Sequence, residues 1–329
     1  MKRIAYLAIF FWIIAIYFFG CTHVAQQPKL VPINIAFQKW VGYGPFYLAD
    51  EKGFFKDEGI KLLFVDEQLD SARRDAFIAG MLDCEAATLD LLISKVAQNA
   101  PLTAVMKIDY SYGADAIVAN QDIAKLEDLA DKKISLARDD VGDTFVSTLF
   151  YKKVILPYSA AFVFVRPEEA AKTFLNGESD ACATWEPYVS EALKKPGAHI
   201  IASTREYPGI IVDTLNVRND LIKKEPAIIK KLLRGWFRAV KYYNEHPDES
   251  SRIIAKYFNI SPEQYRKQVT GLKWYSYEEQ KTDLGKKEWA DIAALLTEVK
   301  LLNGRIPRRM DNSRLITYDF VDSLYEDSK

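Results

Sequence analysis

A hydroxyl and a carboxylate recur at matched positions in two parts of this 329-residue chain, Thr88 with Asp90 and Thr184 with Glu186. Each pair closes the same pattern, in which Gly-X-X-Asp is followed by a short apolar run and Ala-Thr-X-acid. Hydroxyl and carboxylate oxygens at the end of a strand can hold a small polar ligand, or they can cap the helix that follows. We expect ligand contact at these positions, with helix capping as the alternative, above all for the two threonines.

The repeated pattern also predicts the elements that position these side chains. A helix is expected to end at Gly80 and again at Gly177, since glycine readily adopts the left-handed conformation, and a short buried strand begins after each Asp. In open α/β sheets, small molecules bind beyond the carboxyl ends of the strands. Two such edges that face each other would form a cleft, so the repeat predicts two related lobes.

Strands and helices alternate along the chain, which predicts an α/β fold with parallel sheet and crossover helices. An apolar, β-branched segment at 210–217 is expected to return the chain to the first lobe, and the rest is mostly helical. One long helix with its apolar residues in the core should end before Pro247. The expected strands are 33–37, 60–65, 84–87, 102–108, 133–137 and 161–165, with an extended crossing at 114–119, and the expected helices are 45–51, 71–79, 89–97 and one from Thr144.

Composition excludes several classes of function. The formal net charge is -1 and no basic run is present, which argues against nucleic-acid binding. Cys84 and Cys182 each fall in a predicted strand, and we expect them to be buried free thiols. The three histidines are scattered, and the sequence contains no nucleophile elbow, zinc-protease motif, phosphate loop or dinucleotide-binding loop. We therefore expect no metal, no cofactor and no enzymatic activity.

The N-terminus has the layout of an export signal. Two basic residues precede an apolar run that Gly20-Cys21 closes, which resembles a bacterial lipoprotein signal cut before Cys21. We expect a signal peptide at 1–20, a lipid-carrying tether at 21–32, and a membrane-anchored protein in the periplasm or at the cell surface. The alternative is an uncleaved anchor, since about 17 apolar residues can just span a bilayer.

The residues after the first predicted strand carry a family resemblance. The run QKWVGYGPFYLA from Gln38, followed by EKGFF and EGI, resembles the start of the nitrate/sulfonate/taurine class of substrate-binding proteins, the solute receptors of ABC importers. Further matches are GADAIVA from Gly113, NGESDACATWEP from Asn176 and WFRAV from Trp236. The resemblance covers about residues 33–250, and it departs from the family at Leu129-Ala-Asp-Lys-Lys133, where a Gly usually precedes the paired lysines.

The resemblance implies a type II periplasmic-binding-protein fold, in which each of two lobes is a mixed, mostly parallel sheet flanked by helices and a hinged cleft lies between them. Lobe I would comprise 33–115 and 214–329, and lobe II would comprise 116–213. The resemblance also implies a monomer that captures a small molecule by hinge closure and delivers it to an ABC permease and ATPase complex. The family includes sensors that act with a membrane kinase and a few thiamine-precursor enzymes, so the fold alone does not decide the function.

Further ligand-binding candidates are expected where the lobes meet. In the resembling family the loop after the first strand lines the cleft, which nominates Trp40, Tyr43 and Phe46, with lobe packing as the alternative for Phe46. Trp185 offers a flat face and a donor nitrogen. A helix starting near Gly142 and Thr144 offers free N–H groups. The two crossings between lobes contribute four more candidates, which could instead hydrogen-bond the crossings together: Asp109, Ser111, Asp115 and Asp213.

The charge of the expected cleft favours one ligand class. Its acids outnumber its basic residues, chiefly Lys39 and Arg138, and this balance disfavours a bare anion. Carboxylates beside aromatic faces suit an ammonium group or the N–H groups of a heteroaromatic ring. We expect a small nitrogen-containing organic ligand, an amine or a pyrimidine-like ring, with a taurine- or sulfonate-type ligand as the alternative. The acids are Asp90, Asp109, Asp115, Asp139, Asp140, Asp143, Glu186 and Asp213.

Overall fold

The computed structural model describes residues 29–66, 70–152 and 160–325. The predicted signal peptide, Cys21 and most of the predicted tether lie outside these residues. From Val31 onward the chain forms one compact unit. Within the described ranges, no helix combines the length and the apolar character that a membrane span requires.

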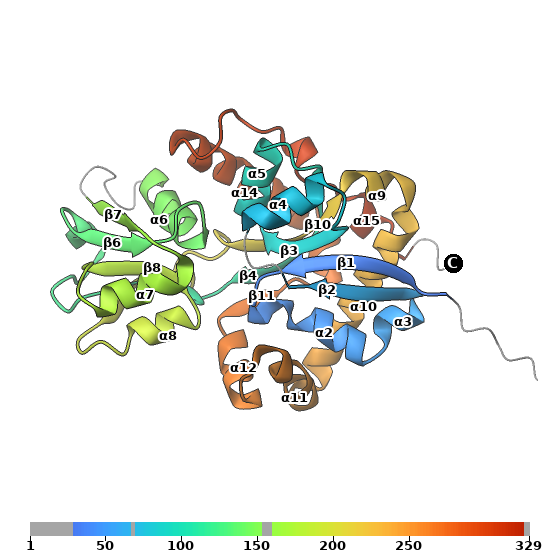
Figure 1. The fold of residues 1–329 in the computed structure, drawn as a ribbon, viewed down its shortest axis with the longest axis horizontal. Helices are drawn as coiled ribbons and strands as arrows, with labels where there is room; N and C mark the ends of the chain where they lie inside the picture. The colour runs from blue at the N-terminus through green and yellow to red at the C-terminus, as the bar shows by residue number, and fades with distance from the viewer. Residues whose placement is uncertain (1–28, 67–69, 153–159, 326–329) are drawn as a thin grey trace, which may run out of the picture. The chain divides into compact units, whose positions relative to one another are not determined.

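Six strands form the first sheet, in the order β11-β4-β10-β3-β1-β2 (Figure 1). Their bounds are β1 Val31–Phe37, β2 Ile60–Val65, β3 Cys84–Thr88, β4 Leu102–Ser111, β10 Val212–Arg218 and β11 Leu272–Trp274. β1 runs parallel to β2 and β3. β10 is antiparallel to both β3 and β4, and β11 is antiparallel to β4.

Five strands form the second sheet, in the order β7-β6-β8-β5-β9. Their bounds are β5 Asp115–Ala119, β6 Lys133–Leu136, β7 Ala161–Phe164, β8 Ala181–Trp185 and β9 His199–Ser203. β6 is parallel to β7 and β8, and β5 is antiparallel to β8 and β9. The carboxyl end of β8 carries the second copy of the repeated pattern, as the end of β3 carries the first.

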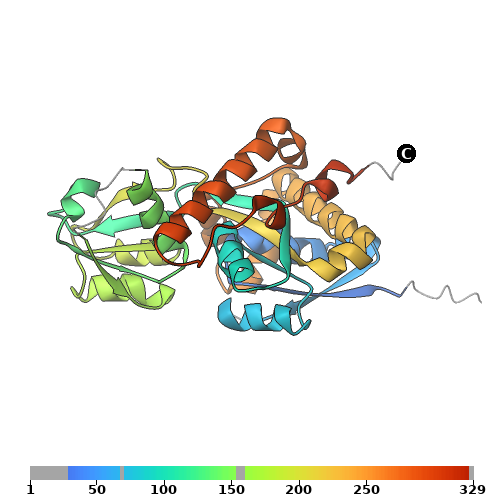
Figure 2. The same ribbon diagram turned by 90° about the horizontal axis from the view of Figure 1, so that it is seen from above.

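Helices flank both sheets (Figures 1 and 2). Those of the second sheet are η2 Leu126–Leu129, α6 Val141–Tyr151, α7 Pro167–Leu175 and α8 Tyr188–Ala192. The helices that precede the second sheet in the chain are η1 Val41–Tyr43, α2 Gly44–Glu51, α3 Phe54–Asp57, α4 Asp70–Ile78 and α5 Leu89–Ala97. After it come α9 Asn219–Lys224, α10 Pro226–Glu245, α11 Pro247–Phe258, α12 Pro262–Val269, α13 Tyr277–Lys281, α14 Asp283–Leu302, η3 Asn312–Arg314 and α15 Asp319–Asp322.

The long helix α10 shows how apolar spacing builds the core. Its buried residues recur every three or four positions, so they form one stripe that packs on α2 and α3. Trp236 is fully buried and its ring contacts Phe46, while Phe55 packs where Gly235 has no side chain. The prediction that the aromatic residues of this helix belong to the core is confirmed for Trp236, Phe237 and Tyr243.

The fold class predicted from sequence is confirmed, with two corrections. Both sheets are mixed and flanked by helices, but antiparallel pairings are at least as frequent as parallel ones, because the strands next to the two crossings reverse direction. Helix α6 begins at Val141, three residues before the predicted start, because Asp140 caps it through a hydrogen bond from the Val141 N–H.

The chain passes between the sheets after β4 and returns before β10. The two passages are hydrogen-bonded to each other, since the Ser111 and Thr204 hydroxyls lie 2.7 Å apart and the Gly113 N–H donates to Thr204. α14 packs against α5 beside the first sheet and against α6 beside the second (Figure 2). The lobe limits 33–115 with 214–329, and 116–213, stay a prediction.

Cys84 and Cys182 are buried free thiols, as predicted. Burial raises the pKa of both thiols, that of Cys182 to about 12, so neither is a ready nucleophile at neutral pH. Within the described residues, no group of three His, Cys, Asp or Glu side chains is arranged to hold a metal ion.

Candidate functional site

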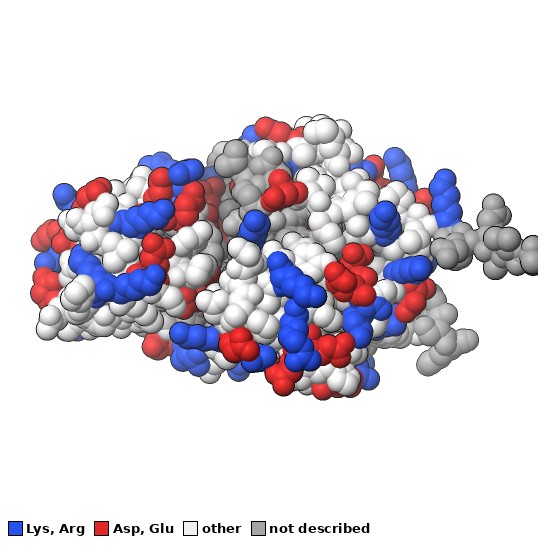
Figure 3. All heavy atoms as spheres, turned by 60° about the horizontal axis from the view of Figure 1, so that its bottom comes forward, with Lys and Arg blue, Asp and Glu red and all other residues white. Residues whose placement is uncertain are grey.

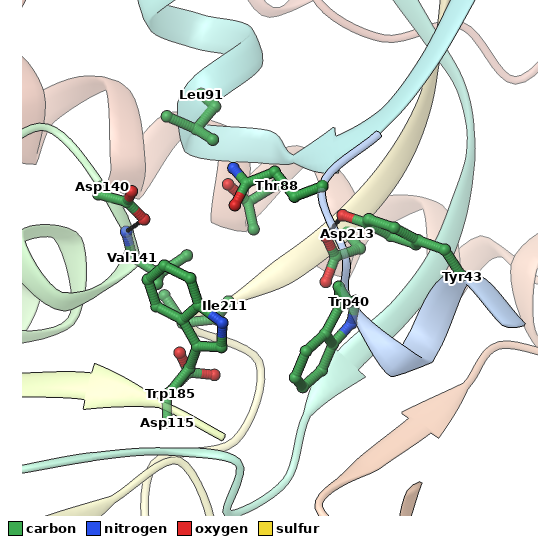
Figure 4. A pocket seen from close by; sticks show the side chains of 11 residues that line it. Trp40, Tyr43, Thr88, Leu91, Asp115, Asp140, Val141, Trp185, Ile211 and Asp213 are labelled. Carbon is green, nitrogen blue, oxygen red and sulfur yellow. Dashed lines mark hydrogen bonds between the residues drawn. The ribbon is translucent and has the colours of Figure 1, made fainter. Parts of the chain in front are cut away.

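A pocket with a volume of about 40 Å³ lies between the two sheets (Figure 4). A cavity needs roughly 10–15 Å³ of such space to hold one water molecule. The pocket therefore fits only a few non-hydrogen atoms unless the two sheets move apart. The lining residues come from both sheets and are Gln38, Trp40, Tyr43, Thr88, Leu91, Asp115, Asp140, Val141, Trp185, Ile211 and Asp213.

Two indole rings enter the pocket from opposite sides (Figure 4). Trp40 follows β1, and Trp185 is the last residue of β8. Gly42 is required beside Trp40, because a Cβ at this position would collide with the Trp40 indole nitrogen and the Asp109 carboxyl. An aromatic face on each wall can stack on a planar ligand or attract a cation.

Three aspartates supply the polar part of the lining. Asp115 begins β5, Asp140 caps α6, and Asp213 lies in β10, where it accepts a hydrogen bond from the Tyr43 hydroxyl. Burial raises the pKa of each of these carboxyls to about 7. Asp115 is 4% exposed and Asp213 is 3% exposed, so ionising them in the empty pocket has a large desolvation cost.

No lysine or arginine belongs to the lining within the part of the chain that the structure describes. The pocket therefore collects carboxyl groups without a cation of its own. Thr88, a residue that is 8% exposed, adds a buried hydroxyl that has no hydrogen-bond partner among the described residues. Thr88 precedes α5, but its side chain makes no capping hydrogen bond. A buried polar group without a partner is unfavourable, so Thr88 is available to a ligand.

Other acids predicted for the cleft are neutralised elsewhere. Lys300 of α14, whose side chain is 3% exposed, lies 3.3 Å from Asp90 and also pairs with Asp139. Arg305 pairs with Asp143 at 2.6 Å. The charge predicted for the cleft did not include Lys300 or Arg305, because both residues come from the C-terminal part of the chain. Through these ion pairs, α14 and the residues just after it connect α5 with α6.

The structure places several predicted site residues outside the pocket lining. Phe46 is fully buried between Phe37 and Trp236, so it has the role in lobe packing that was the alternative to ligand contact. Gly142 lies against the Ala183 carbonyl, so it permits close helix–strand packing. Glu186 accepts hydrogen bonds from the Ser190 N–H and hydroxyl, at 3.1 and 2.9 Å, and thereby caps α8.

Among the remaining candidates outside the lining, Thr144 and Ser111 are held by internal hydrogen bonds. The Thr144 hydroxyl donates to Asp90 at 2.6 Å. Ser111 joins the two crossings, which was the alternative to ligand contact. Thr184 is 2% exposed in β8, and its hydroxyl, like that of Thr88, has no hydrogen-bond partner among the described residues. Asp109 lies fully buried beside the lining residue Asp213.

The predicted list and the lining share six residues: Trp40, Tyr43, Thr88, Asp115, Trp185 and Asp213. Ligand contact at these positions stays a prediction. The list omitted Gln38, Leu91, Val141 and Ile211, and it omitted Asp140, which was predicted only as one of the acids of the cleft. Gln38 and Asp140 carried a usable signal, since each is the polar residue directly after a strand or before a helix. Leu91, Val141 and Ile211 are apolar and carry no such signal.

The architecture defines a class of protein. Two helix-flanked mixed sheets with a pocket between them form the fold of periplasmic binding proteins, the class to which the substrate receptors of ABC importers belong. The chain itself belongs to the NMT1/THI5-like family, whose sequence model matches residues 40–250. The resemblance inferred from sequence motifs is thereby confirmed.

Similar proteins fit this assignment. A Bacillus subtilis (strain 168) protein named as a candidate aliphatic sulfonates-binding protein is 29% identical over 240 residues, 70% of either chain. The periplasmic aliphatic sulphonate binding protein SsuA from Escherichia coli has a TM-score of 0.73 at 16% identity, covering 88% of this chain and 92% of its own. The periplasmic nitrate-binding protein NrtA from Synechocystis PCC 6803 has a TM-score of 0.67 at 13% identity, covering 92% and 90%. At these identities the two structures show the shared fold.

Proposed function

We propose that the protein is the solute-binding lipoprotein of an ABC importer and captures a small organic ligand with positively charged or N–H donor nitrogen, an amine or a pyrimidine-like ring. One observation carries the ligand class: two buried aspartates, the half-buried Asp140 and two indole rings line the pocket, and no described lining residue is basic. The family and the fold support the receptor role.

The chemistry of the pocket favours a donor ligand over an acceptor. A bound ammonium group would donate charge-assisted hydrogen bonds to carboxylates such as Asp115 and Asp213 and would compensate their buried charge. A cation over an aromatic face adds about 0.5–2 kcal/mol, which the indoles of Trp40 and Trp185 can supply. Nitrate or a simple sulfonate would meet carboxyl groups and find no cation in the lining.

We propose that capture proceeds by closure of the two lobes. Trp40, Tyr43 and Asp213 come from the side of the first sheet, and Asp115 and Trp185 come from the second. A ligand that contacts both sides stabilises the closed arrangement through contacts that the open one lacks. The closed monomer would then dock on the permease, while a lipid on Cys21 keeps it at the outer face of a membrane.

The surface is compatible with this role. On the face shown in Figure 3, basic and acidic side chains are interspersed, and neither sign dominates. Together with the net charge of -1, this mixture supports recognition of a small solute in the pocket over binding of a nucleic-acid backbone.

A zwitterionic sulfonate such as taurine is the second candidate, because a relative is named for aliphatic sulfonates. Its amine would bind the aspartates. Its acid group would need donors, yet at the start of α6 the Val141 N–H already donates to Asp140 at 2.6 Å. Glu186, another candidate partner for the amine, instead accepts the hydrogen bond of the Ser190 hydroxyl at the start of α8. A third role, in which the closed form signals to a membrane kinase, would be favoured by a kinase gene beside this one in place of permease and ATPase genes.

Thermal unfolding of the protein without residues 1–21 tests the proposal. The panel contains alkylamines, pyrimidines, purines, thiamine precursors, taurine, alkanesulfonates and nitrate. A ligand at a hundred times its Kd stabilises the native state by about 2.7 kcal/mol, so one chemical class should raise the Tm in a saturable way.

A matched pair of variants localises the effect. Asp115→Asn should reduce the ligand-induced rise, whereas Asp122→Asn, which removes a 68% exposed acid paired with Lys132, should leave it unchanged. A rise with nitrate or an amine-free sulfonate alone would show that the proposed ligand class is wrong.

A further inference from the structure

A second carboxyl group lies directly behind the pocket carboxyl of Asp213. β4 and β10 are paired with a register shift between Val212 and Thr214, and this shift leaves Asp213 opposite the segment that contains Asp109. Asp109 is 0% exposed, and its carboxyl lies close enough to that of Asp213 for each to shift the pKa of the other. Two buried carboxylates so close together would repel each other, so the arrangement requires a proton between them.

The hydrogen bonding of Asp109 points to the same proton. Neither of its side-chain oxygens has a hydrogen-bond donor with good geometry in the described chain. The Trp40 indole N–H lies beside the Asp109 carboxyl and favours its ionised form, but burial and the Asp213 charge oppose this effect, and the indole nitrogen has no well-aligned partner among the described residues. A protonated Asp109 that donates to Asp213 would satisfy one of these oxygens. Asp213 would then accept from both Asp109 and the Tyr43 hydroxyl.

Among the residues that the structure describes, the surrounding elements supply no compensating cation to this pair. Arg73 of α4 acts on Tyr43, but it is itself paired with Asp70 and Glu85. Lys107, also on β4, donates to the Gly285 carbonyl and to Glu288. The other ionisable groups that act on the pair are acids or phenols from η1, α5, β5, α12 and the segment after β11: Tyr43, Asp90, Asp115, Tyr265 and Tyr275.

We propose that the empty pocket holds one proton between Asp109 and Asp213 and exchanges it for the positive charge of a cationic ligand. This inference rests on the proposed function and makes it more specific, since it selects an ammonium-type cation over a neutral heteroaromatic ring. Asp109 is not in the lining and acts as a positioning residue, because it orients Asp213 and stores the proton.

The exchange conserves charge at the pocket. In the empty state the Asp109 O–H donates to Asp213, and burial together with the neighbouring Asp213 charge raises the pKa of Asp109 well above its usual range. When a cation pairs with Asp213, the favourable charge interaction lowers the free energy of the second carboxylate. Asp109 then releases its proton to solvent, so one cation enters and one proton leaves. Protons compete with the ligand, and binding should weaken as the pH falls.

Infrared spectroscopy of the ligand-free protein without residues 1–21 tests the stored proton. At pH 8, above the pKa of about 7 of Asp115 and Asp140, we expect a protonated-carboxyl C=O stretch. Asp109→Asn keeps a donor of similar shape beside Asp213, and it should remove this band. Asp143→Asn, which removes a carboxylate paired with Arg305, should leave the band unchanged. Absence of the band, or its survival in Asp109→Asn, would overturn the proposal.

Calorimetric titration with methylammonium chloride at pH 8 tests the exchange. An alkylammonium stays charged at this pH, since its pKa is near that of lysine, about 10.4. Titration in two buffers of different ionisation enthalpy gives the number of protons released. We expect about one proton per cation for the original protein and for Asp143→Asn, and close to none for Asp109→Asn.

The outcomes separate this inference from the proposed function. Methylammonium binding without proton release, or with equal release in Asp109→Asn, overturns the exchange and leaves the receptor role intact. Binding of an anionic or neutral compound in place of every ammonium compound in the panel overturns the exchange and the proposed ligand class together. A panel in which nothing binds counts against the proposed function, and the infrared band then decides whether the stored proton exists.

Discussion

Replacing Lys300 by Met should destabilise the protein far more than removing any exposed lysine of the same helix. The Lys300 side chain is 3% exposed and Asp90 is 2% exposed, so their ion pair is shielded from water. Lys300 also pairs with Asp139 on the α6 side. Removing the cation leaves buried carboxylate charge without compensation, which costs about 3–5 kcal/mol for one broken buried pair.

The expected change in Tm follows from this free energy. A loss of 1 kcal/mol lowers the Tm of a domain of 150–250 residues by about 2–4 °C, so Lys300→Met should lower the Tm by roughly 6–20 °C at neutral pH. Lys287→Met is the matched control, because Lys287 lies on the same helix and pairs with Asp291 at the surface, with side chains 71% and 64% exposed. Such a pair contributes about 0–1 kcal/mol.

Scanning calorimetry at two pH values completes the test. At pH 4 the orphaned carboxyls of the Lys300→Met variant can take up protons, so its deficit relative to the original protein should shrink. Adding Asp90→Asn to Lys300→Met should recover part of the loss, since it removes one uncompensated charge. If Lys300→Met were no less stable than Lys287→Met, or if the double variant lost the full sum of the single losses, the argument for a buried pair would fail.

Three further changes test the pocket. Trp185→Ala should weaken binding of the ligand found in the thermal screen at least about tenfold and lower the Tm only slightly. The core variant Trp236→Ala is the control and should lose about 3–5 kcal/mol of stability. If Trp185→Ala lost binding and stability to the same extent, the role of Trp185 would be structural. Asp115→Asn should raise the Tm at pH 8 and change it little at pH 4. Burial raises the pKa of Asp115 to about 7, so between about pH 4 and 7 the folded state binds more protons than the unfolded state, and stability falls as the pH rises. An effect of the substitution that does not depend on pH would contradict this reasoning. Glu186→Ala should leave ligand affinity unchanged in titration and cost about 0.5–2 kcal/mol of stability in calorimetry, because it removes the acceptor of the Ser190 N–H in the first turn of α8; a tenfold loss of affinity would return Glu186 to the site.

Local patterns predicted the elements well. Gly80 and Gly177 both have the left-handed conformation that the repeat required, with φ of 74° and 78°. The predicted strand at 60–65 and the predicted helix at 89–97 match β2 and α5. These features depend on residues within a few positions of each other, on apolar periodicity and on glycine geometry, so they can be read without knowledge of the fold.

The candidate site was only partly predictable for a physical reason. Sequence position identified side chains at strand ends, which is why Thr88, Asp115, Trp185 and Asp213 were nominated. It could not show which of the acids had partners. Lys300 and Asp139 are 161 positions apart in sequence, and no local pattern records their contact.

The sequence by itself determined most of the strands and helices before Val217, although not β9, together with the repeated strand ends at the pocket and the motifs of the family; it did not predict β11. The tertiary structure decided the charge of the site. Packing of α14 against α5 and α6 brings Lys300 and Arg305 to Asp90, Asp139 and Asp143, whereas Asp115, Asp140 and Asp213 receive no cation from the described lining. Electrostatic energy depends on distance and burial in space, and separation along the chain fixes neither of these.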